Sequence, residues 1–534
     1  MTTATTATTA TAATAAATRA DSTRRWWVLA VMSVGTLMVF LDDTVVNTAL
    51  PRISLDLRAS ISDLQWVVDA YVVSLAGLLL LCGSVGDRYG RRRVMASGLV
   101  LFGSASAGAA LSSSIGPLII MRALQGVGAA MVLPATLSII TNVFPREERG
   151  RAIAVWTAIG GIGIGLGPVV GGYLIDAARW SAVFWLQVPI VLAALAGMVI
   201  VPESRDERRA GLDVPGAVLG TAGLTALVYG IIRGGEVGWS SSGVVLSFTA
   251  ATLLLVAFAF VERRAAAPML PLAFFRQRDF TGAVLVIGIA VFALFVSFFF
   301  LTQLFQLVQH RSALAAGLLI VPASIGMIIG SGLAGKLIHS IGPRILVVVM
   351  TGGMLLGLGL LTRTTVSSTA FEIDSALVIF GIGAGLGLPA LTDSVMAAVP
   401  ERDAGVGSAV NDVSRQLGGA LGVAVIGGFV SSAYRSNLRG SLGATLGPGV
   451  ARSAEQGIGV ASRVASALPA NVGATLTRLA DSAFVDAITR GFVISAAVMV
   501  AALIVAVTML PRRMRTVQAQ ADPHSRTEVR EKVS

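Results

Sequence analysis

Charged side chains stand inside long apolar runs of this chain, and they are the residues best placed to do chemistry. Asp42 and Asp43 lie in FLDDTVVN, Asp69 in WVVDAY and Arg122 in IIMRALQG. An ionisable group costs about 2.5–3.5 kcal/mol at the centre of a membrane helix, so its presence there indicates a function. Burial favours a protonated carboxyl group, whereas a nearby guanidinium or bound cation favours the carboxylate. We therefore predict that Asp42, Asp69 and Arg122 exchange protons against a cationic ligand.

The depths of these residues in their predicted spans agree with one another. Counting about 1.5 Å per helical residue from the span ends puts Asp42 roughly 12 Å and Asp69 roughly 9 Å below the same membrane face. Arg122 lies at a similar depth. Asp43 points about 100° away from Asp42 on a helix, so it either pairs locally or contacts substrate. A static Asp–Arg pair that only holds helices together is the alternative to proton exchange.

The elements that position these residues are apolar runs of membrane-spanning length. The 534-residue chain is 54% hydrophobic with a mean hydropathy of +0.80. A soluble domain of this length exposes more charge, and about 20 apolar residues cross a hydrocarbon core as a helix. We predict an all-α polytopic membrane protein. Its fourteen spans are 26–50, 64–82, 94–112, 117–140, 151–173, 181–201, 213–232, 243–261, 280–305, 313–337, 344–362, 374–397, 403–431 and 484–510.

The charge distribution predicts how the chain is oriented. The net charge of +11 results from 40 Lys and Arg against 29 Asp and Glu, and the basic residues gather in short loops between spans. This is the positive-inside pattern, so we expect the bilayer and no nucleic acid as a partner. Both termini are predicted to be cytoplasmic in a multi-pass protein of the cell membrane. Cys82 is the one cysteine, which excludes an intrachain disulfide.

Segment composition and an internal repeat divide the chain. Glycine spacing after the second span, at residues 83–91, is repeated after the tenth, at 332–344, which indicates two six-helix halves. The outer loop at 433–483 contains a weakly amphipathic stretch, Val460–Leu479, that could hold surface helices, although we favour a passive connection. The predicted parts are a disordered tail (1–23), a first half (24–203), two linker spans (204–264), a second half (265–510) and a cytoplasmic tail (511–534).

The loop after the second span reads GSVGDRYGRRRV and combines close-packing glycines with an acid and several arginines. It resembles the loop signature G-x-x-x-D-R-x-G-R-R of the major facilitator superfamily of transporters. A plain topology anchor is the alternative. The resemblance implies a conformational role for Gly83, Gly86, Asp87, Arg88, Gly90 and Arg91.

The fifth span contains GGIGIGLGPVVGGY, in which the near-absence of side chains lets helices pack backbone to backbone. Its residues Gly163, Gly167, Pro168, Gly171 and Gly172 resemble an exporter signature of that superfamily, thought to form a gate seal. The stretches at Leu41–Pro51, Arg122–Gly128, 179–190 and 414–422 resemble the fourteen-helix drug:proton antiporter family. The resemblance implies that Arg122 takes part in proton transfer. Gln187 and Ala178 differ from the residues usual in the family. Because both lie where a helix begins, these differences do not weaken the resemblance.

The second half offers further candidates. Asp412 and Arg415 share a helix face, so Asp412 is either part of a structural pair or a second proton-coupling site. The Phe-rich stretch from Phe292 to Phe305 suits a pocket for flat lipophilic compounds, or a packing surface. The predicted substrate-binding residues are Asp43, Trp66, Tyr71, Gln125, Trp156, Phe300 and Gln303.

These observations predict a proton-driven antiporter that exports lipophilic, cationic drugs by alternating access. A dedicated exporter of one endogenous small molecule, such as a self-made antibiotic, is the alternative. The nucleotide-binding motif G-x-x-x-x-G-K-[ST] does not occur, and three His and one Cys form no recognisable catalytic or metal set, so we expect no enzyme. A sensor or scaffold would not need buried charge. We expect no cofactor beyond the proton gradient, no metal, and a monomer.

Overall fold

The structure is a computed structural model that describes residues 3–511, apart from 206–212, 266–267, 269, 271, 400–403 and 443–447. These residues form helices and no strands, and fourteen of the helices are long and apolar enough to cross a membrane. The predicted number of spans is therefore confirmed. Helices satisfy every backbone hydrogen bond within one segment, as a lipid environment requires.

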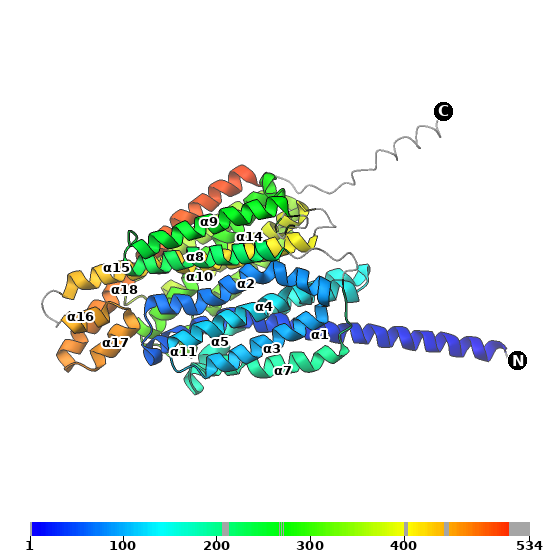
Figure 1. The fold of residues 1–534 in the computed structure, drawn as a ribbon, viewed down its shortest axis with the longest axis horizontal. Coiled ribbons are helices and arrows are strands. Elements are labelled where there is room, and N and C mark those ends of the chain that lie inside the picture. The colour runs from blue at the N-terminus through cyan, green and yellow to red at the C-terminus, as the bar shows by residue number, and fades with distance from the viewer. Residues whose placement is uncertain are drawn as a thin grey trace, which may run out of the picture.

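The first six spans pack together, and together they position the charged residues of the first half. In this group α1 packs on α5, and α4 packs on both α2 and α3 (Figure 1). The sixth span is broken into two helices and a 3₁₀ turn. The bounds are α1 (Thr3–Leu57), α2 (Ile61–Tyr89), α3 (Arg91–Ala110), α4 (Ile115–Val143), α5 (Arg146–Ala177), α6 (Ala182–Trp185), α7 (Gln187–Gly197) and η1 (Met198–Ile200).

The last six spans form a second packed group, in which α14 contacts α12 and α13 while α10 contacts α15 and α18. The long helix α10 ends in one π-helical turn, η3. The bounds are η2 (Phe274–Arg276), α10 (Arg278–Gln303), η3 (Leu304–Val308), α11 (Ala313–Leu318), α12 (Val321–Ile341), α13 (Pro343–Leu361), α14 (Ala370–Ala397), α15 (Ala404–Leu442), α16 (Pro448–Ala454), α17 (Ile458–Ser466) and α18 (Ala470–Met509).

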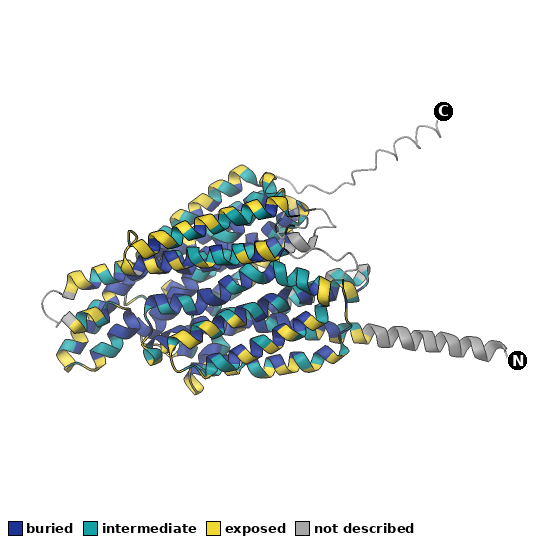
Figure 2. Cartoon of the chain, in the orientation of Figure 1, coloured by how far each residue is buried: buried dark blue, intermediate teal, exposed yellow. Residues whose placement is uncertain are grey.

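Two linker helices, α8 (Val214–Val237) and α9 (Ser242–Arg264), stand between the groups in sequence. Helix α8 packs against α2 of the first group and α15 of the second. Helix α9 exposes Leu246, Leu253 and Val256 on its outer side, as a helix that faces lipid tails does. In Figure 2 exposed residues line its outer face while buried residues fill the middle of the bundle. The exact domain borders stay predictions.

The amino-terminal segment differs from the prediction. Helix α1 begins at Thr3, inside the tail of residues 1–23 that we predicted to be disordered. The segment is rich in Ala, which has the highest helix propensity. Side chains are described only from Thr23 onward, and the predicted cytoplasmic tail lies outside the described residues after Pro511.

The prediction of a long loop at 433–483 is wrong for most of its length. Helix α15 continues to Leu442, α18 begins at Ala470, and two short helices, α16 and α17, lie between them. We call α16 and α17 the cap; Figure 1 shows it beyond the end of the bundle. Helix α17 buries Ile458, Val460 and Ala461 against protein, so it is a packed element rather than a helix on the membrane surface.

Candidate functional site

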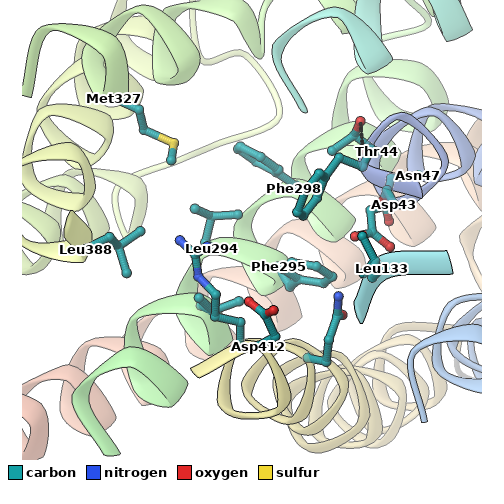
Figure 3. Close-up of a pocket in the computed structure, with 14 residues that line it drawn as sticks. Asp43, Thr44, Asn47, Leu133, Leu294, Phe295, Phe298, Met327, Leu388 and Asp412 are labelled. Carbon is teal, nitrogen blue, oxygen red and sulfur yellow. Dashed lines mark hydrogen bonds between the residues drawn. The ribbon is translucent and has the colours of Figure 1, made fainter. Parts of the chain in front are cut away.

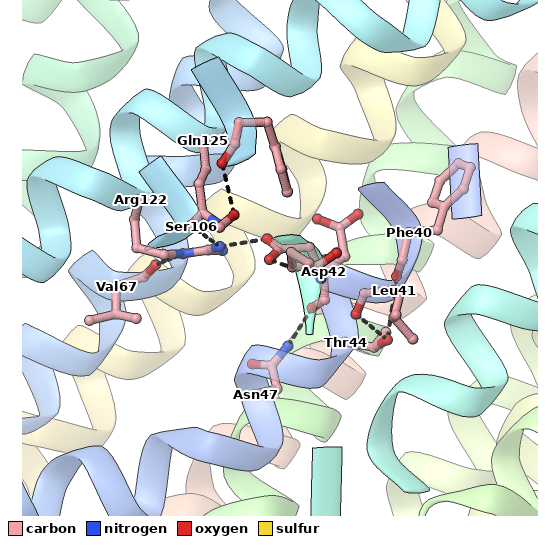
Figure 4. A network of polar contacts seen from close by, with 12 residues as sticks. Phe40, Leu41, Asp42, Thr44, Asn47, Val67, Ser106, Arg122 and Gln125 are labelled. Atoms are coloured by element: carbon pink, nitrogen blue, oxygen red, sulfur yellow. Dashed lines mark hydrogen bonds and ion pairs between the residues drawn. The ribbon is translucent and has the colours of Figure 1, made fainter. Parts of the chain in front are cut away.

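A buried ion pair joins the first and fourth spans. Arg122 Nη1 lies 2.5 Å from Asp42 Oδ2, and both residues are at most 1% exposed. The same guanidinium donates from Nε to the Val67 carbonyl at 2.9 Å and from Nη1 to Gln125 Oε1 at 3.0 Å (Figure 4). Asp42 and Arg122, which the sequence places at a similar membrane depth, are therefore in contact. A buried charge is tolerated where its partner and hydrogen bonds are provided, as they are here.

Neighbouring side chains hold this pair in position. The Tyr71 ring centroid lies 4.3 Å from the guanidinium carbon of Arg122, a cation–π distance. Gln125 donates to Ser106 Oγ at 2.8 Å, which fixes the amide that contacts Arg122. Gln187 reaches Asp42 Oδ1 at 3.5 Å. The sequence prediction gave Gln187 little weight, yet the fold brings it to the charged pair.

Asp69 occupies a different setting from Asp42. It is fully buried, and neither of its carboxylate oxygens has a hydrogen-bond partner among the described residues. It lies one helical turn from Gln65, which donates to the carbonyls of Val423 and Ala424 on α15. Residues four apart share a helix face, so Asp69 faces the seam between α2 and α15. The charge pair and Asp69 are thus separate features of the first half.

A cavity of about 90 Å³ lies between the two groups of helices (Figure 3). Helices α1 and α4 supply one wall, and α10, α12, α14 and α15 supply the other. Two carboxylates, Asp43 and Asp412, line it together with one guanidinium, Arg415, in an otherwise largely apolar wall. The lining residues are Phe40, Asp43, Thr44, Asn47, Leu133, Val291, Leu294, Phe295, Phe298, Met327, Leu388, Asp412, Arg415 and Gln416.

The cavity wall contains one of the seven predicted substrate-binding residues. Asp43 lines it, but the other six are not among the described residues of its wall. Tyr71 and Gln125 instead contact Arg122, and Trp66 packs against Tyr229 of linker helix α8 with ring centroids 6.2 Å apart.

The remaining three predicted residues are Trp156, Phe300 and Gln303. Trp156 lies partly buried on α5 and packs against the core. Phe300 packs on Phe299 and Phe484 inside the second half, and Gln303 donates to the Phe299 carbonyl. The Phe-rich stretch contributes Phe295 and Phe298 to the cavity, because these two lie three apart on the face opposite Phe300.

Asp412 and Arg415 both face the cavity, as their shared helix face predicts. Asn411 donates to Asp412 Oδ1 at 3.4 Å and accepts from Thr392 Oγ1 at 3.2 Å. The charges of Asp412 and Arg415, which both lie on α15, interact with each other. Asn411 therefore holds Asp412 through a bond to α14, and its role could not be read from spacing alone.

The glycines of α5 form a flat strip against α1. A Cβ added at Gly163 would meet the Leu37 carbonyl at 3.1 Å, and one at Gly171 would meet the Val45 carbonyl at 3.1 Å. Gly167 contacts Thr44 in the same strip. Gly172 faces the second half, where an added Cβ would lie 2.6 Å from Leu314 Cα. Close backbone contact of this kind favours glycine.

The two groups of helices meet tightly at one end of the bundle, which we call the α1–α2 end. Asp176 accepts hydrogen bonds from the backbone nitrogens of Ala313 at 3.0 Å and Leu314 at 2.8 Å, at the start of α11. Gln306 donates to the Thr48 carbonyl at 2.9 Å. In the cap, the Arg463 guanidinium contacts the Leu55 carbonyl. These residues were not predicted, because each partner is remote in sequence.

The opposite end, which we call the α2–α3 end, contains the predicted loop motif. Gly90 has φ = 114°, a conformation that favours glycine, and a side chain there would meet the Glu203 carboxylate. Arg91 pairs with Asp87 at 2.8 Å, and Glu203 accepts from the Arg92 backbone nitrogen at 3.1 Å. Glu203 follows the sixth span and gave no signal in the sequence.

The other motif residues have local contacts. An added Cβ at Gly83 would lie 3.5 Å from Pro134 of α4, in ordinary contact, and Gly86 lies beside Arg91. The Arg88 guanidinium lies over the Tyr89 ring at 5.6 Å. Gly342, after the corresponding span of the second half, also has a positive φ of 81°. Both halves therefore turn at this end through a glycine.

Comparison with known proteins agrees with this geometry. The family model described as "Major Facilitator Superfamily" matches residues 32–423. The chain is 38% identical to the puromycin resistance protein pur8 of Streptomyces alboniger, over 77% of this chain and 82% of that protein. It is 35% identical to the multidrug efflux pump LfrA of Mycolicibacterium smegmatis, over 88% of this chain and 92% of that protein.

Solved structures share the fold at low sequence identity. A bacterial homologue of the human lysosomal transporter Spinster, in an inward-facing and occupied conformation, matches with a TM-score of 0.58 at 17% identity, over 90% of this chain and 96% of that one. A D-xylose–proton symporter matches with a TM-score of 0.58 at 14% identity, over 91% and 98%. This chain therefore belongs to the Major Facilitator Superfamily and, within it, to the drug efflux transporters.

Proposed function

We propose that this chain is a proton-driven antiporter that exports lipophilic cations by alternating access. The cavity between the two groups of helices carries the proposal, because it combines two carboxylates with an apolar, aromatic wall. Asp43 and Asp412 would attract a cation, while Phe295 and Phe298 would contact its flat apolar part. Among the described residues of the wall, Arg415 is the one guanidinium that opposes the two carboxylates.

The size of the cavity indicates which state of the transport cycle the structure represents. Pockets for drug-sized ligands measure about 300–1,000 Å³, whereas this cavity measures about 90 Å³. The two groups of helices are joined at the α1–α2 end through Asp176, Gln306 and Arg463. Loading a substrate would therefore require the helices to part at the α2–α3 end, and release would require the α1–α2 contacts to break.

The ion pair supplies a means of coupling. Asp42 on α1 pairs with Arg122 on α4. A relative movement of the two helices that separates the pair would leave a buried charge, which is relieved when Asp42 takes up a proton. Restoring the pair would return that proton to water. Asp69 would serve as a second proton site, since its carboxyl group is buried and has no hydrogen-bond partner among the residues that the structure describes.

The charge distribution supports an orientation. The α2–α3 end carries Arg88, Arg91, Arg92 and Arg93, which the positive-inside rule places in the cytoplasm. Both termini would then be cytoplasmic in the cell membrane, and the α1–α2 end would face outward. We propose that the protein works as a monomer, catalyses no chemical reaction, and needs no cofactor other than the proton gradient.

A dedicated exporter of one endogenous compound is the second candidate. The name of pur8 refers to puromycin, and a 32% identical protein of Streptomyces glaucescens is named for the resistance to and export of tetracenomycin C. LfrA is named as a multidrug pump. A dedicated exporter and a multidrug exporter would use the same charged residues and differ in the residues of the cavity wall. Measuring the range of transported substrates therefore distinguishes the two functions.

A reconstituted assay tests the proposal. Purified protein would be placed in liposomes with a pH-sensitive dye inside, and a panel of lipophilic cations would be added under an imposed proton gradient. We expect substrate-triggered proton movement in the wild type and none in Asp42→Asn. Asp56→Asn is the matched control, because Asp56 is exposed at the end of α1. Absence of proton movement with every cation would contradict a multidrug antiporter and favour the dedicated exporter.

A further inference from the structure

Tyr71 of α2 connects the ion pair of the first half with the transport cavity. Its side chain is fully buried, and its ring centroid lies 4.3 Å from the guanidinium carbon of Arg122. Its hydroxyl interacts with the carboxylate of Asp43, which lines the cavity. Tyr71 itself is not among the described residues of the cavity wall. It therefore contacts a residue of each functional site without lining the space that a substrate would occupy.

The ring of Tyr71 belongs to a contact that α2 makes with Arg122 from one face. Arg122 donates from Nε to the carbonyl of Val67, which lies one helical turn before Tyr71. The attraction between a cation and an aromatic ring is strongest where water is excluded. Both Tyr71 and Arg122 are at most 1% exposed. The ring therefore favours the position in which Arg122 pairs with Asp42.

The hydroxyl of Tyr71 has a second possible position. Neither this hydroxyl nor Asp43 Oδ1 forms a hydrogen bond with a residue that the structure describes, although both atoms are buried. An unpaired buried hydroxyl is unfavourable, so a small displacement that lets it donate to Asp43 is an available alternative. The charged groups that act on Tyr71 are Asp43, Asp42 and Arg122. Tyr71 thus has two competing partners, Arg122 for its ring and Asp43 for its hydroxyl.

We propose that Tyr71 is a positioning residue that couples cation binding at Asp43 to proton release from Asp42. This inference rests on the function proposed above. When the hydroxyl donates to Asp43, the ring leaves Arg122, the ion pair is weakened and Asp42 takes up a proton. A cation at Asp43 excludes that position, so the ring returns to Arg122. The ion pair then forms, and Asp42 releases its proton to water.

The direction of this coupling is the one that an antiporter needs. Cation binding and proton release occur together, although the cation and the proton occupy different carboxylates. Because linkage between two sites is reciprocal, a proton on Asp42 weakens cation binding at Asp43 by the same factor. The observed position, with the ring on Arg122 and the hydroxyl not bonded to Asp43, is the one that a cation would select.

Proton release on cation binding tests this inference on the full-length protein in detergent. The probe is tetraphenylphosphonium, and a pH indicator in weakly buffered solution counts the protons released per bound cation. We expect the wild type to release more protons than Asp42→Asn, in which only direct displacement from other carboxyl groups remains. Tyr71→Phe keeps the ring and removes the hydroxyl, so it should release only as many protons as Asp42→Asn. The double variant Asp42→Asn/Tyr71→Phe should match either single variant.

Cation affinity separates coupling from a structural effect. Tyr71→Phe should bind tetraphenylphosphonium roughly fivefold more tightly at acidic pH, because no hydroxyl competes for Asp43. A structural defect would instead weaken binding and lower the unfolding midpoint. Tyr434→Phe is the matched control, since Tyr434 is also fully buried and its hydroxyl donates to the Ala454 carbonyl of the cap. This control should release as many protons as the wild type.

The outcomes distinguish this inference from the proposed function. If Tyr71→Phe releases as many protons as the wild type, Tyr71 does not couple the two sites, and the proposed antiport stands without it. If the wild type releases no more protons than Asp42→Asn, the proposed role of Asp42 fails, and this inference fails with it. Weaker cation binding in Tyr71→Phe would also overturn the inference, because it would show that the hydroxyl does not compete with the cation.

Discussion

At the scale of single residues, the two neighbouring aspartates of α1 have different surroundings. Asp42 faces Arg122 in a closed hydrogen-bonded network, and Asp43 faces the cavity between the halves. The helical rotation of about 100° between adjacent residues accounts for the division. The ion pair and the cavity are thereby connected through two adjacent residues of one helix.

The buried pair leads to a prediction about stability and transport. Arg122→Ala would leave Asp42 buried without its partner, a change that costs roughly 3–5 kcal/mol. We expect a lower unfolding midpoint in detergent and loss of proton exchange. The double variant Asp42→Asn/Arg122→Gln should recover most of the midpoint without recovering exchange. If exchange returned with the stability, the pair would have only a structural role.

The two remaining aspartates of the first half should differ in selectivity. Asp43 lines the cavity, so Asp43→Asn should reduce transport of cationic substrates at least tenfold while neutral substrates are retained. Asp69 is not among the described residues of that wall, so Asp69→Asn should weaken cationic and neutral substrates equally. Transport rates for a cation and a neutral compound of similar size check both statements. Selective loss of cations in Asp69→Asn would place this residue in the substrate path.

At the scale of helices, the glycine strip of α5 explains how the halves close at the α1–α2 end. The face formed by Gly163, Gly167 and Gly171 fixes α5 on α1, while Gly172 receives α11. The strip thus transmits the position of α1, which holds both Asp42 and Asp43, to the second half. A movement of α1 during proton exchange would therefore shift α5 and change its contact with α11 at the closed end.

A substitution in the strip tests this closure. In Gly172→Ala the added methyl would lie 2.6 Å from Leu314 Cα, so α5 and α11 would have to separate. We expect a proton leak through liposomes without substrate. Gly161→Ala is the matched control in the same helix, since an added Cβ there meets nothing within 4 Å. If both variants leak equally, or if neither leaks, the contact between Gly172 and α11 does not seal this end against protons.

The carboxylate that joins α5 to α11 gives a separate prediction. Asp176→Ala removes two hydrogen bonds that a charged group accepts, and we expect the population open at this end to rise roughly fivefold. The labelling rate of Leu314→Cys by a membrane-impermeant maleimide, in a Cys82→Ser background, measures that population. Asp176→Asn should have an intermediate effect, because one acceptor oxygen remains. If Asp176→Ala leaves the labelling rate unchanged, the Asp176 hydrogen bonds do not hold this end closed.

At the scale of the whole molecule, the cap connects the two halves across the closed end. Helix α17 belongs to the second half but contacts α1 through Arg463, whose guanidinium meets the Leu55 carbonyl. In the turn between α16 and α17, the Gln456 carbonyl accepts from the Ile61 nitrogen at the start of α2 at 3.3 Å. Gly459 packs on Ser54. Alternating access would therefore require the cap to leave α1 whenever the α1–α2 end opens.

A disulfide across this contact should stop the cycle. A Cβ at position 459 would lie 2.9 Å from Ser54 Cβ, so Ser54→Cys/Gly459→Cys can form a bond after a small shift. In a Cys82→Ser background we expect oxidation to abolish transport and reduction to restore it. The single-cysteine variants should transport under both conditions. Full activity of the cross-linked protein would show that the cap need not move.

The sequence by itself determined the fold class and identified charged residues that lie inside the membrane spans. Fourteen long apolar runs predict fourteen spans because a bilayer permits few other structures, and charge in such runs is costly enough to mark Asp42, Asp69 and Arg122. Glycine motifs indicated close helix contacts for the same reason, since only glycine allows backbones to touch. These signals are local, so a single chain reveals them.

The tertiary structure decided which side chains share a space. Helical spacing cannot tell which face of a helix turns toward the cavity, so the sequence does not distinguish Leu133 and Met327, which line it, from other apolar residues. Asp176 and the cap depend on partners more than 130 residues away in sequence. Such contacts follow from the packing of two halves whose interfaces are set by the whole chain, and no local pattern contains them.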